Sequence, residues 1–414
     1  MWPEELERRA LAVFTDLLKI KSVNPPGNEK PAADYIIEAL KPFGIEAEYI
    51  EKSPGRGNVV ARLKGGRERP VILLSHIDVV AADEAKWRKP AFEAVTEDGC
   101  IWGRGALDTK HLTAMQIIAM TELAKAEKPL NRNVYFIASA DEERGGGEGM
   151  AFLSQSHIDF AQNAYVVSEG GGFPVSVCGK DIMLYAAGEK ASLRFILRAN
   201  CAAGYADFIK ALNALCSFRF PQTMTPISRK FFLESGANPD SDNISGDGAV
   251  DNIIRYMLRG SFHVTEIRTQ TGAGPAGPLM SAELELKFLP PIAYEKALGL
   301  LKEITGGLDV ECEILEFHPG YESSVNNELI DAFEANCGRF GFDGRLLPFY
   351  ALGRTDGRFL AGRGADIYGL SPVLQSDSFT EILPRVHGND ERISIASFLF
   401  GTKVMAQTLR DLCV

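Results

Sequence analysis

The sequence predicts an α/β protein whose main part is interrupted by a smaller α+β module. The chain has 414 residues, more than one hydrophobic core usually serves, so we expect two domains. Amphipathic helical patterns alternate with short apolar runs up to about Gly188, as in a sheet covered by helices on both faces. Strands of alternating polar and apolar residues follow, and the first pattern returns after Pro319-Gly320. We therefore expect a first part at 1–187, an inserted module at 188–317 and a second part at 318–414.

The composition is that of an ordinary globular protein. A net charge of −11 gives no basis for binding nucleic acid or an anionic membrane. No apolar run approaches the roughly 20 residues of a membrane-spanning helix, and the first residues show no secretory pattern. The seven cysteines include no C-x-x-C pair, which favours reduced thiols. We therefore expect a cytoplasmic protein without nucleic-acid or membrane partners.

The elements of the first part follow from the spacing of apolar residues. Helical spacing between Glu4 and Lys19 predicts an amphipathic helix, and the same pattern predicts helices at 32–40 and 109–126. Short runs rich in β-branched residues predict strands at 58–63, 71–74, 134–138 and 164–167. The run at 71–74 is apolar on both faces, as expected of a central strand.

Alternation within the module predicts three strands and two helices, namely strands at 192–198, 263–269 and 282–288 and helices at 205–215 and 293–304. Residues 235–250, rich in Gly, Asn, Asp and Ser, are predicted to form a loop. The second part should contain a helix at 328–337 and a strand at 365–370. We expect Asn389-Asp390-Glu391-Arg392 to open a final helix, with its acids at the positive end of the helix dipole.

Acids and a histidine follow the predicted central strands. His76 comes after the run at 71–74, Glu142 and Glu143 after 134–138, and Glu169 after 164–167. Ligands of open α/β sheets gather at the carboxyl ends of strands, so these side chains should share one crevice. Asp108, preceded by two glycines and followed by a predicted helix, completes a set of residue types that is typical of a metal site.

Each of these residues also has an ordinary explanation when it is taken alone. His76 could be a packed or capping histidine, and Asp108 could cap the helix that follows it. Glu142-Glu143 could be a solvated pair in a loop, and His387 a plain loop histidine. We expect His111, in the first turn of a helix, to lie at the surface. The glycine-rich runs match no phosphate-binding loop, and Ser75 and Ser168 lack the context of a nucleophile elbow.

Five motifs stand in a fixed order along the chain: Ser75-His76-Ile77-Asp78, Gly103-Arg104-Gly105-Ala106-Leu107-Asp108-Thr109-Lys110, Asp141-Glu142-Glu143-Arg144-Gly145-Gly146, Gly353-Arg354-Thr355-Asp356 and His387-Gly388-Asn389-Asp390-Glu391-Arg392. In this order they resemble the dizinc metallopeptidases known as family twenty. This family includes aminoacylase, glutamate carboxypeptidase, acetylornithine deacetylase and succinyl-diaminopimelate desuccinylase. The resemblance covers the whole chain and is weaker in the module. It implies a mixed-sheet zinc-exopeptidase catalytic domain with an inserted α+β lid of the dimerisation type, and hence a homodimer through the lid.

The resemblance also assigns roles to the motif residues. It implies two Zn²⁺ ions with five ligands, His76 and Glu169 on one ion, Glu143 and His387 on the other, and Asp108 between them. Asp78 would hold the His76 ring through its other nitrogen, and Glu142 would be the general base. A pair of ions roughly 3.5–4 Å apart can activate water and hold the substrate oxygen, and Co²⁺ or Mn²⁺ suit the same ligands. A cis peptide between Asp108 and Thr109 is also implied.

The module departs from the family pattern. The segment 198–205 lacks the usual histidine, and Pro275-Ala276-Gly277-Pro278 and Leu286-Lys287-Phe288 replace motifs associated with substrate binding. A free substrate carboxylate must then be bound by other donors or not be bound at all. Among Arg268, Lys287 and Arg354, the last is the best candidate because it lies in a preserved motif. Alternatively, Arg354 pairs with Asp356 on the surface.

Two classes of function remain open. The first is a zinc-dependent hydrolase of N-acyl amino acids or of peptide bonds, and the sequence does not separate a deacylase from a carboxypeptidase or dipeptidase. The second is a metal-binding protein of the same fold that has a degenerate lid and no amidase turnover. The presence of Glu142 argues against the second class, because a protein without turnover needs no general base.

Overall fold

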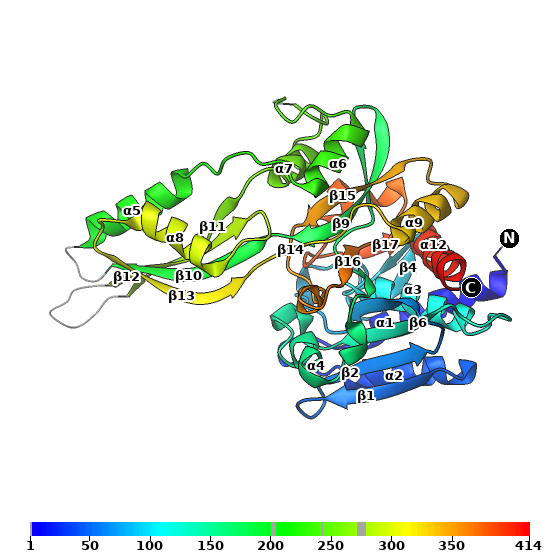
Figure 1. The fold of residues 1–414 in the computed structure, drawn as a ribbon. Helices are drawn as coiled ribbons and strands as arrows, with labels where there is room; N and C mark the ends of the chain where they lie inside the picture. The colour runs from blue at the N-terminus through cyan, green and yellow to red at the C-terminus, as the bar shows by residue number, and fades with distance from the viewer. Residues whose placement is uncertain (1, 200–203, 242, 271–278) are drawn as a thin grey trace.

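The computed structural model describes residues 2–199, 204–241, 243–270 and 279–414. A large part built on a mixed sheet carries a smaller four-stranded layer that projects from it (Figure 1). Half of the segment at 198–205 that lacks the expected histidine, namely 200–203, and all of 275–278 lie outside the described residues. The predicted α/β class with a mixed sheet is confirmed.

The large sheet has the strand order β1-β2-β6-β3-β7-β16-β9-β14, and β15 and β8 also pair with β9. Strands β6, β3, β7 and β16 run parallel to one another, so their carboxyl ends meet at one edge. The strands are β1 (Glu46–Glu51), β2 (Gly57–Leu63), β3 (Glu68–His76), β6 (Arg132–Ser139), β7 (Tyr165–Ser168), β8 (Phe173–Val177), β9 (Lys180–Glu189), β14 (Tyr321–Glu322), β15 (Arg345–Ala351) and β16 (Asp366–Gly369).

Helices cover both faces of this sheet. Alternate residues of β3 point to opposite faces, so Val71 and Leu73 join one hydrophobic cluster while Ile72 and Leu74 join another. The first cluster includes residues of α1 (Glu4–Lys19), α2 (Lys30–Leu40), α3 (Lys110–Leu123), α9 (Glu328–Arg339), α11 (Phe379–Ile382) and α12 (Ile395–Cys413). The second includes residues of α4 (Met150–Ser156) and α10 (Arg358–Ala361). The apolar run at 71–74 is therefore a central strand, as predicted.

A separate three-stranded sheet joins two distant parts of the chain. Its order is β17-β5-β4, and its strands are β4 (Val95–Glu97), β5 (Cys100–Trp102) and β17 (Arg392–Ser394). The prediction that Asn389 to Arg392 opens the last helix is wrong, because this segment leads into β17. The last helix, α12, begins at Ile395, and the Ser394 hydroxyl caps it by accepting the backbone N–H of Ser397.

Glu391, in the segment that was predicted to open α12, has a structural role away from that helix. Its side chain is fully buried and pairs with the buried Arg104, 2.6 Å away. The same carboxylate accepts the backbone N–H groups of Gly105, Leu107 and Asp108. Tertiary hydrogen bonds, rather than a helix dipole, therefore stabilise this acid.

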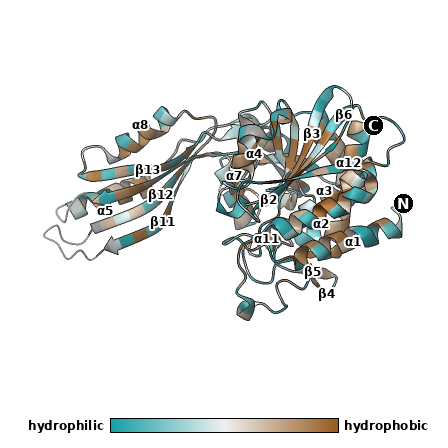
Figure 2. Cartoon of the chain, turned by 90° about the horizontal axis from the view of Figure 1, so that it is seen from below, coloured by the Kyte–Doolittle hydropathy of each residue, from teal (hydrophilic) through white to brown (hydrophobic). Residues whose placement is uncertain are grey.

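The projecting layer is an antiparallel sheet with the order β11-β12-β10-β13. Its strands are β10 (Ala191–Ala199), β11 (Ser261–Gln270), β12 (Leu279–Phe288) and β13 (Val310–His318), and α5 (Tyr205–Ser217) and α8 (Tyr294–Thr305) cover one face. The strands alternate brown and teal along their length (Figure 2), in agreement with the alternation seen in the sequence. The opposite face carries the charged side chains of these strands, Arg194 and Glu316 among them.

The segment between the first helix and the second strand of this layer returns to the large part. It contains α6 (Pro226–Ser235) and α7 (Gly248–Tyr256), both of which the sequence analysis missed. Apolar residues of these helices, such as Phe231 and Ile254, belong to the main hydrophobic cluster. The prediction of a loop at 235–250 is wrong for its last three residues, because α7 begins at Gly248. Residues 188–317 therefore contribute to two cores rather than one.

No helix among the described residues combines the length and the apolar character needed to cross a membrane.

Replacing Glu391 with Gln tests the buried contact that this carboxylate makes with Arg104. The substitution leaves a buried guanidinium without its counter-charge, so the free energy of unfolding should fall by about 3–5 kcal/mol. Urea unfolding measures this change. The matched control is Glu381→Gln, which removes an exposed partner of Arg385 and should change stability by no more than about 0.5 kcal/mol. Equal stability of wild type and Glu391→Gln would contradict the expectation.

Candidate metal centre

The parallel strands deliver acids and a histidine to one edge of the large sheet. β3 ends at His76, β7 ends directly before Glu169, and β6 ends shortly before Glu142 and Glu143. Asp108 arrives from the loop between β5 and α3, and His387 from the loop between α11 and β17. The β5–β17 pairing places these two loops beside each other, so residues from five segments meet.

The five predicted ligands form two groups that share Asp108. In the first group, the Nε2 atom of His76 lies 3.0 Å from Oδ1 of Asp108 and 3.3 Å from Oε2 of Glu169. In the second, the Nε2 atom of His387 lies 2.9 Å from Oδ2 of Asp108 and 3.0 Å from Oε2 of Glu143. The ligand-type atoms within each group all lie within 4.8 Å of one another. This is the grouping that the resemblance implies, with one carboxylate oxygen of Asp108 facing each group.

The electrostatics of this cluster fit bound cations. Burial raises the pKa of Glu169 to about 7, and burial also raises the pKa of Glu143. Hydrogen bonds to Asp108 and Glu143 raise the pKa of His387 to about 10. Among the described residues, the Oε1 atom of Glu143 is buried without a hydrogen-bond partner. Three carboxylates and two imidazoles so close together are a donor set suited to two divalent ions such as Zn²⁺.

Asp78 supports both a predicted ligand and the predicted base. The Nδ1 atom of His76 lies 3.0 Å from the backbone oxygen of Asp78 and 3.4 Å from its carboxylate. The backbone oxygen of Asp78 is thus closer than its carboxylate to this ring nitrogen of His76. That carboxylate accepts the backbone N–H groups of Glu142 and Glu143 and a hydrogen bond from Asn24. Asp78 therefore positions the turn that carries both glutamates.

Glu142 lies in a short 3₁₀ turn at Glu142–Arg144, where its carboxylate faces the ligand cluster. Asp141, directly before it, adopts a φ of 66°, and its carboxylate accepts hydrogen bonds from Asn24 and Arg56. A Cβ on Gly146 would approach Oδ1 of Asp356 to 2.9 Å, and the φ of Gly146 is 76°, so this position after the acids favours glycine. Burial and the negative charge of Glu169 raise the pKa of Glu142. A carboxyl group with a raised pKa is suited to accept a proton and return it.

The first turn of α3 lies behind Asp108. The Asp108–Thr109 peptide is cis, as the resemblance implies. His111 is buried, so the expectation that it lies at the surface is wrong. The reason is that α3 is covered by α1 and α12 as well as by the sheet, and most of its side chains are buried. Burial lowers the pKa of His111 to about 4, so its ring is neutral.

Arg354 lines a cavity together with Glu142, Glu143 and His387, but it does not pair with Asp356. Its Nη1 atom donates to Oε2 of Glu316 on β13, 2.7 Å away. Asp356 is instead buried and accepts a hydrogen bond from the hydroxyl of Ser139. The surface pair between Arg354 and Asp356 is therefore absent from the described contacts.

A polar cavity of about 560 Å³ connects the cluster with the projecting layer. Its lining includes Glu142, Glu143 and His387 together with four arginines, Arg144, Arg194, Arg354 and Arg358. Arg194 and Arg358 were not predicted from the sequence. Arg358 lies two residues beyond a recognised motif, whereas no spacing along the chain connects Arg194 on β10 with the cluster.

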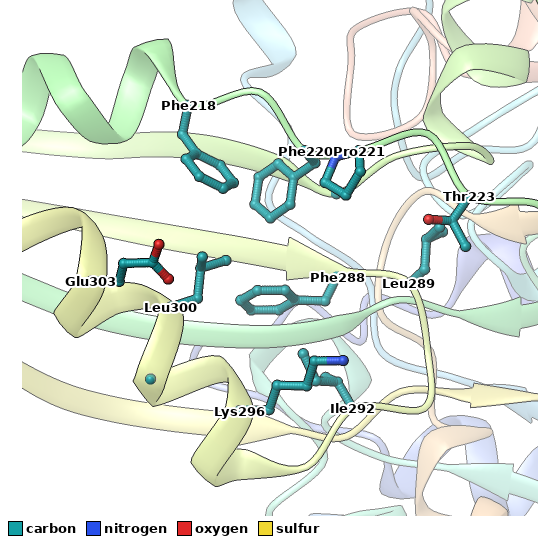
Figure 3. Close-up of a pocket in the computed structure, with 12 residues that line it drawn as sticks. Phe218, Phe220, Pro221, Thr223, Phe288, Leu289, Ile292, Lys296, Leu300 and Glu303 are labelled. Carbon is teal, nitrogen blue, oxygen red and sulfur yellow. The ribbon is translucent and has the colours of Figure 1, made fainter.

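A second cavity, of about 490 Å³, is apolar (Figure 3). Phe218 and Phe220 lie on one side of it and Phe288 and Leu300 on the other. It shares no lining residue with the polar cavity, so it is separate from the metal-type cluster.

Residues 72–411 match the sequence pattern of peptidase family M20/M25/M40. The chain belongs to this family. As a family member it is a metallohydrolase that acts on amide or peptide C–N bonds. The resemblance seen in the motifs is thereby confirmed.

Among its curated relatives in this family, the human N-fatty-acyl-amino acid synthase/hydrolase PM20D1 is 27% identical, over 83% of this chain and 74% of that protein. Human aminoacylase-1 is 24% identical, over 98% of this chain and 96% of that protein. The M20 metallo-carboxypeptidase Sso-CP2 from Sulfolobus solfataricus has a similar fold, with a TM-score of 0.73, 18% identity and coverage of 97% and 98% of the two chains. Human carnosine dipeptidase 1 does too, with a TM-score of 0.70, 14% identity and coverage of 99% and 97%.

Replacing Asp108 with Ala tests the shared ligand. Because its two carboxylate oxygens face the two groups, we expect the variant to lose both ions. Elemental analysis of purified, zinc-loaded protein should give about two ions per chain for wild type and fewer than one for Asp108→Ala. The exposed His157, replaced with Ala, is the control and should leave metal content unchanged. Two tightly held ions in Asp108→Ala would rule out the bridging role.

Proposed function

We propose that this protein is a dizinc hydrolase of N-acyl amino acids, with His76, Asp108, Glu143, Glu169 and His387 as metal ligands. The observation that carries the proposal is the pair of donor groups that share Asp108, with Glu142 in the same cavity. Co²⁺ and Mn²⁺ are expected to substitute for Zn²⁺, because carboxylate and imidazole ligands suit all three.

The residues around the cluster support hydrolysis of an amide. When bound, the zinc ions would supply a nucleophilic water at neutral pH and positive charge for the developing oxyanion. Glu142 accepts the proton of the attacking water as the C–O bond forms, and it returns that proton to the nitrogen as the C–N bond breaks. The backbone hydrogen bonds from Glu142 and Glu143 to Asp78 hold the base in place during both transfers.

The relatives favour acylated amino acids as substrates. PM20D1 and aminoacylase-1 are named for that chemistry and share 27% and 24% of their residues with this chain, more than the carboxypeptidase and the dipeptidase at 18% and 14%. Short peptides are the second candidate, since both of those peptidases share the fold. Turnover of a panel of N-acyl amino acids, including acetylated ones, and dipeptides by the zinc-loaded protein separates the two.

We also propose a cytoplasmic homodimer that forms through the projecting layer and has no nucleic-acid or membrane partner. The net charge of −11 supports the absence of nucleic-acid binding. The six cysteines among the described residues are all free thiols, which fits a reducing compartment. A metal-binding protein without turnover is the alternative, and the placement of Glu142 beside the ligands counts against it.

Replacing Glu142 with Gln should remove hydrolysis while leaving both ions bound. The amide cannot accept the proton of water, so kcat should fall by about 10²–10⁴-fold. Steady-state kinetics together with elemental analysis measure the two effects. Glu97→Gln, an exposed substitution in β4, is the control. If Glu142→Gln hydrolyses substrate normally while Glu143→Gln keeps both ions, the two roles have been assigned to the wrong residues.

Replacing Arg354 with Ala should weaken binding of substrates that carry a carboxylate. The loss of one charge-assisted contact should raise KM by roughly tenfold. The check is a comparison of KM for an N-acyl amino acid and for its carboxamide. A KM for the carboxylate substrate that stays at the wild-type value would exclude Arg354 from the site.

A further inference from the structure

The charged face of the projecting layer carries two arginine–glutamate pairs of similar kind. On β10, Arg198 pairs with Glu313 of β13 at 2.6 Å, and Arg194 pairs with Glu283 of β12 at 2.5 Å. Of these four residues, only Arg194 also lines the polar cavity. The pair of Arg198 and Glu313 therefore serves as a control, because it also joins β10 to a neighbouring strand but does not line the cavity.

Glu316, on the same strand as Glu313, lies between two guanidinium groups. Its Oε2 atom accepts from Arg354 at 2.7 Å and lies 3.5 Å from Nη1 of Arg194. Its Oε1 atom lies 2.7 Å from Nε2 of His318. Partial burial raises the pKa of Glu316, but the hydrogen bonds from Arg354 and His318 outweigh it and hold the pKa at about 2. Glu316 is thus an ionised carboxylate at neutral pH.

These contacts show where the cavity accommodates a carboxylate. One guanidinium comes from the projecting layer and the other from the loop between β15 and α10, which belongs to the large part. Glu142, Glu143 and His387 line the same cavity, so a molecule held by the two arginines can reach the cluster. Arg194 also donates through Nη2 to Glu283, so Glu316 is not the only partner of this guanidinium.

We propose that Arg194 and Arg354 together form the binding site for the substrate's carboxylate, and that Glu316 occupies this site when the cavity is empty. The inference rests on the proposed amide hydrolysis, because it places the carboxylate of an N-acyl amino acid in the same cavity as Glu142. A substrate carboxylate has the same charge and geometry as the Glu316 carboxylate and exchanges with it. Glu316 therefore lowers the apparent affinity for acidic substrates, and Arg194 is a specificity-determining residue that no motif reveals.

Kinetics with a matched pair of substrates test this exchange. With N-acetyl-leucine, Glu316→Gln should lower KM by at least threefold, because the competing charge is gone, and Arg194→Ala should raise KM by roughly tenfold. With N-acetyl-leucinamide, both variants should keep the wild-type KM, and kcat should change little. The control is Glu313→Gln, which removes a glutamate from the same strand and should leave KM for both substrates unchanged.

Calorimetric binding in a Glu142→Gln background gives a second measurement that does not depend on turnover. N-acetyl-leucine should bind more tightly when Glu316→Gln is added and more weakly when Arg194→Ala is added, while the carboxamide should show neither change. Equal effects on the two compounds, or equal effects of Glu316→Gln and Glu313→Gln, would overturn the proposal, as would absence of binding in every protein. Wild-type protein that binds N-acetyl-leucine with these differences but hydrolyses neither compound would contradict the proposed function alone.

Discussion

The buried carboxylate of Glu391 holds together the part of the molecule on which the candidate metal centre depends. It accepts three backbone N–H groups of the loop that ends at Asp108, and it neutralises the buried Arg104. A loop rich in glycine has little conformational preference of its own. Hydrogen bonds from outside the loop therefore determine the position of Asp108, and the residue that supplies them is only four positions from His387.

A second buried carboxylate, that of Asp78, positions the backbone turn that carries Glu142 and Glu143. The carboxylate of Asp78 binds the backbone of Glu142 and Glu143, just as Glu391 binds the backbone before Asp108. Both acids are fully buried and are satisfied mainly by N–H groups rather than by water. Rigid support of this kind matters because a catalytic site tolerates displacements of only about 0.5 Å. The central strands set the approximate place of each ligand, and the buried acids fix its position.

Local patterns predicted the positions that depend on local structure. His76 and Glu169 were found because each follows a short apolar strand, and the alternating residues of β10 and β12 were recognised in the same way. The start of α12 was missed because Asn389-Asp390-Glu391 has the composition of a helix start, whereas the carboxylate of Glu391 bonds to a loop almost 300 residues earlier. His111 was misplaced because burial of α3 on all sides depends on α1 and α12. The contact between Arg354 and Glu316 joins two segments that no periodicity relates, so no sequence pattern could predict it.

The return of α6 and α7 to the main core changes how the projecting layer can move. Two connections would suffice for an inserted domain, but the chain passes between the layer and the large part four times, near residues 190, 218–225, 258–261 and 318–321. One of these passages is anchored, since the hydroxyl of Tyr350 in β15 donates to Thr225. Four covalent connections resist twisting and sliding far more than two do. Because the polar cavity is lined by residues of both the layer and the large part, these connections also limit how far its two walls can shift past each other.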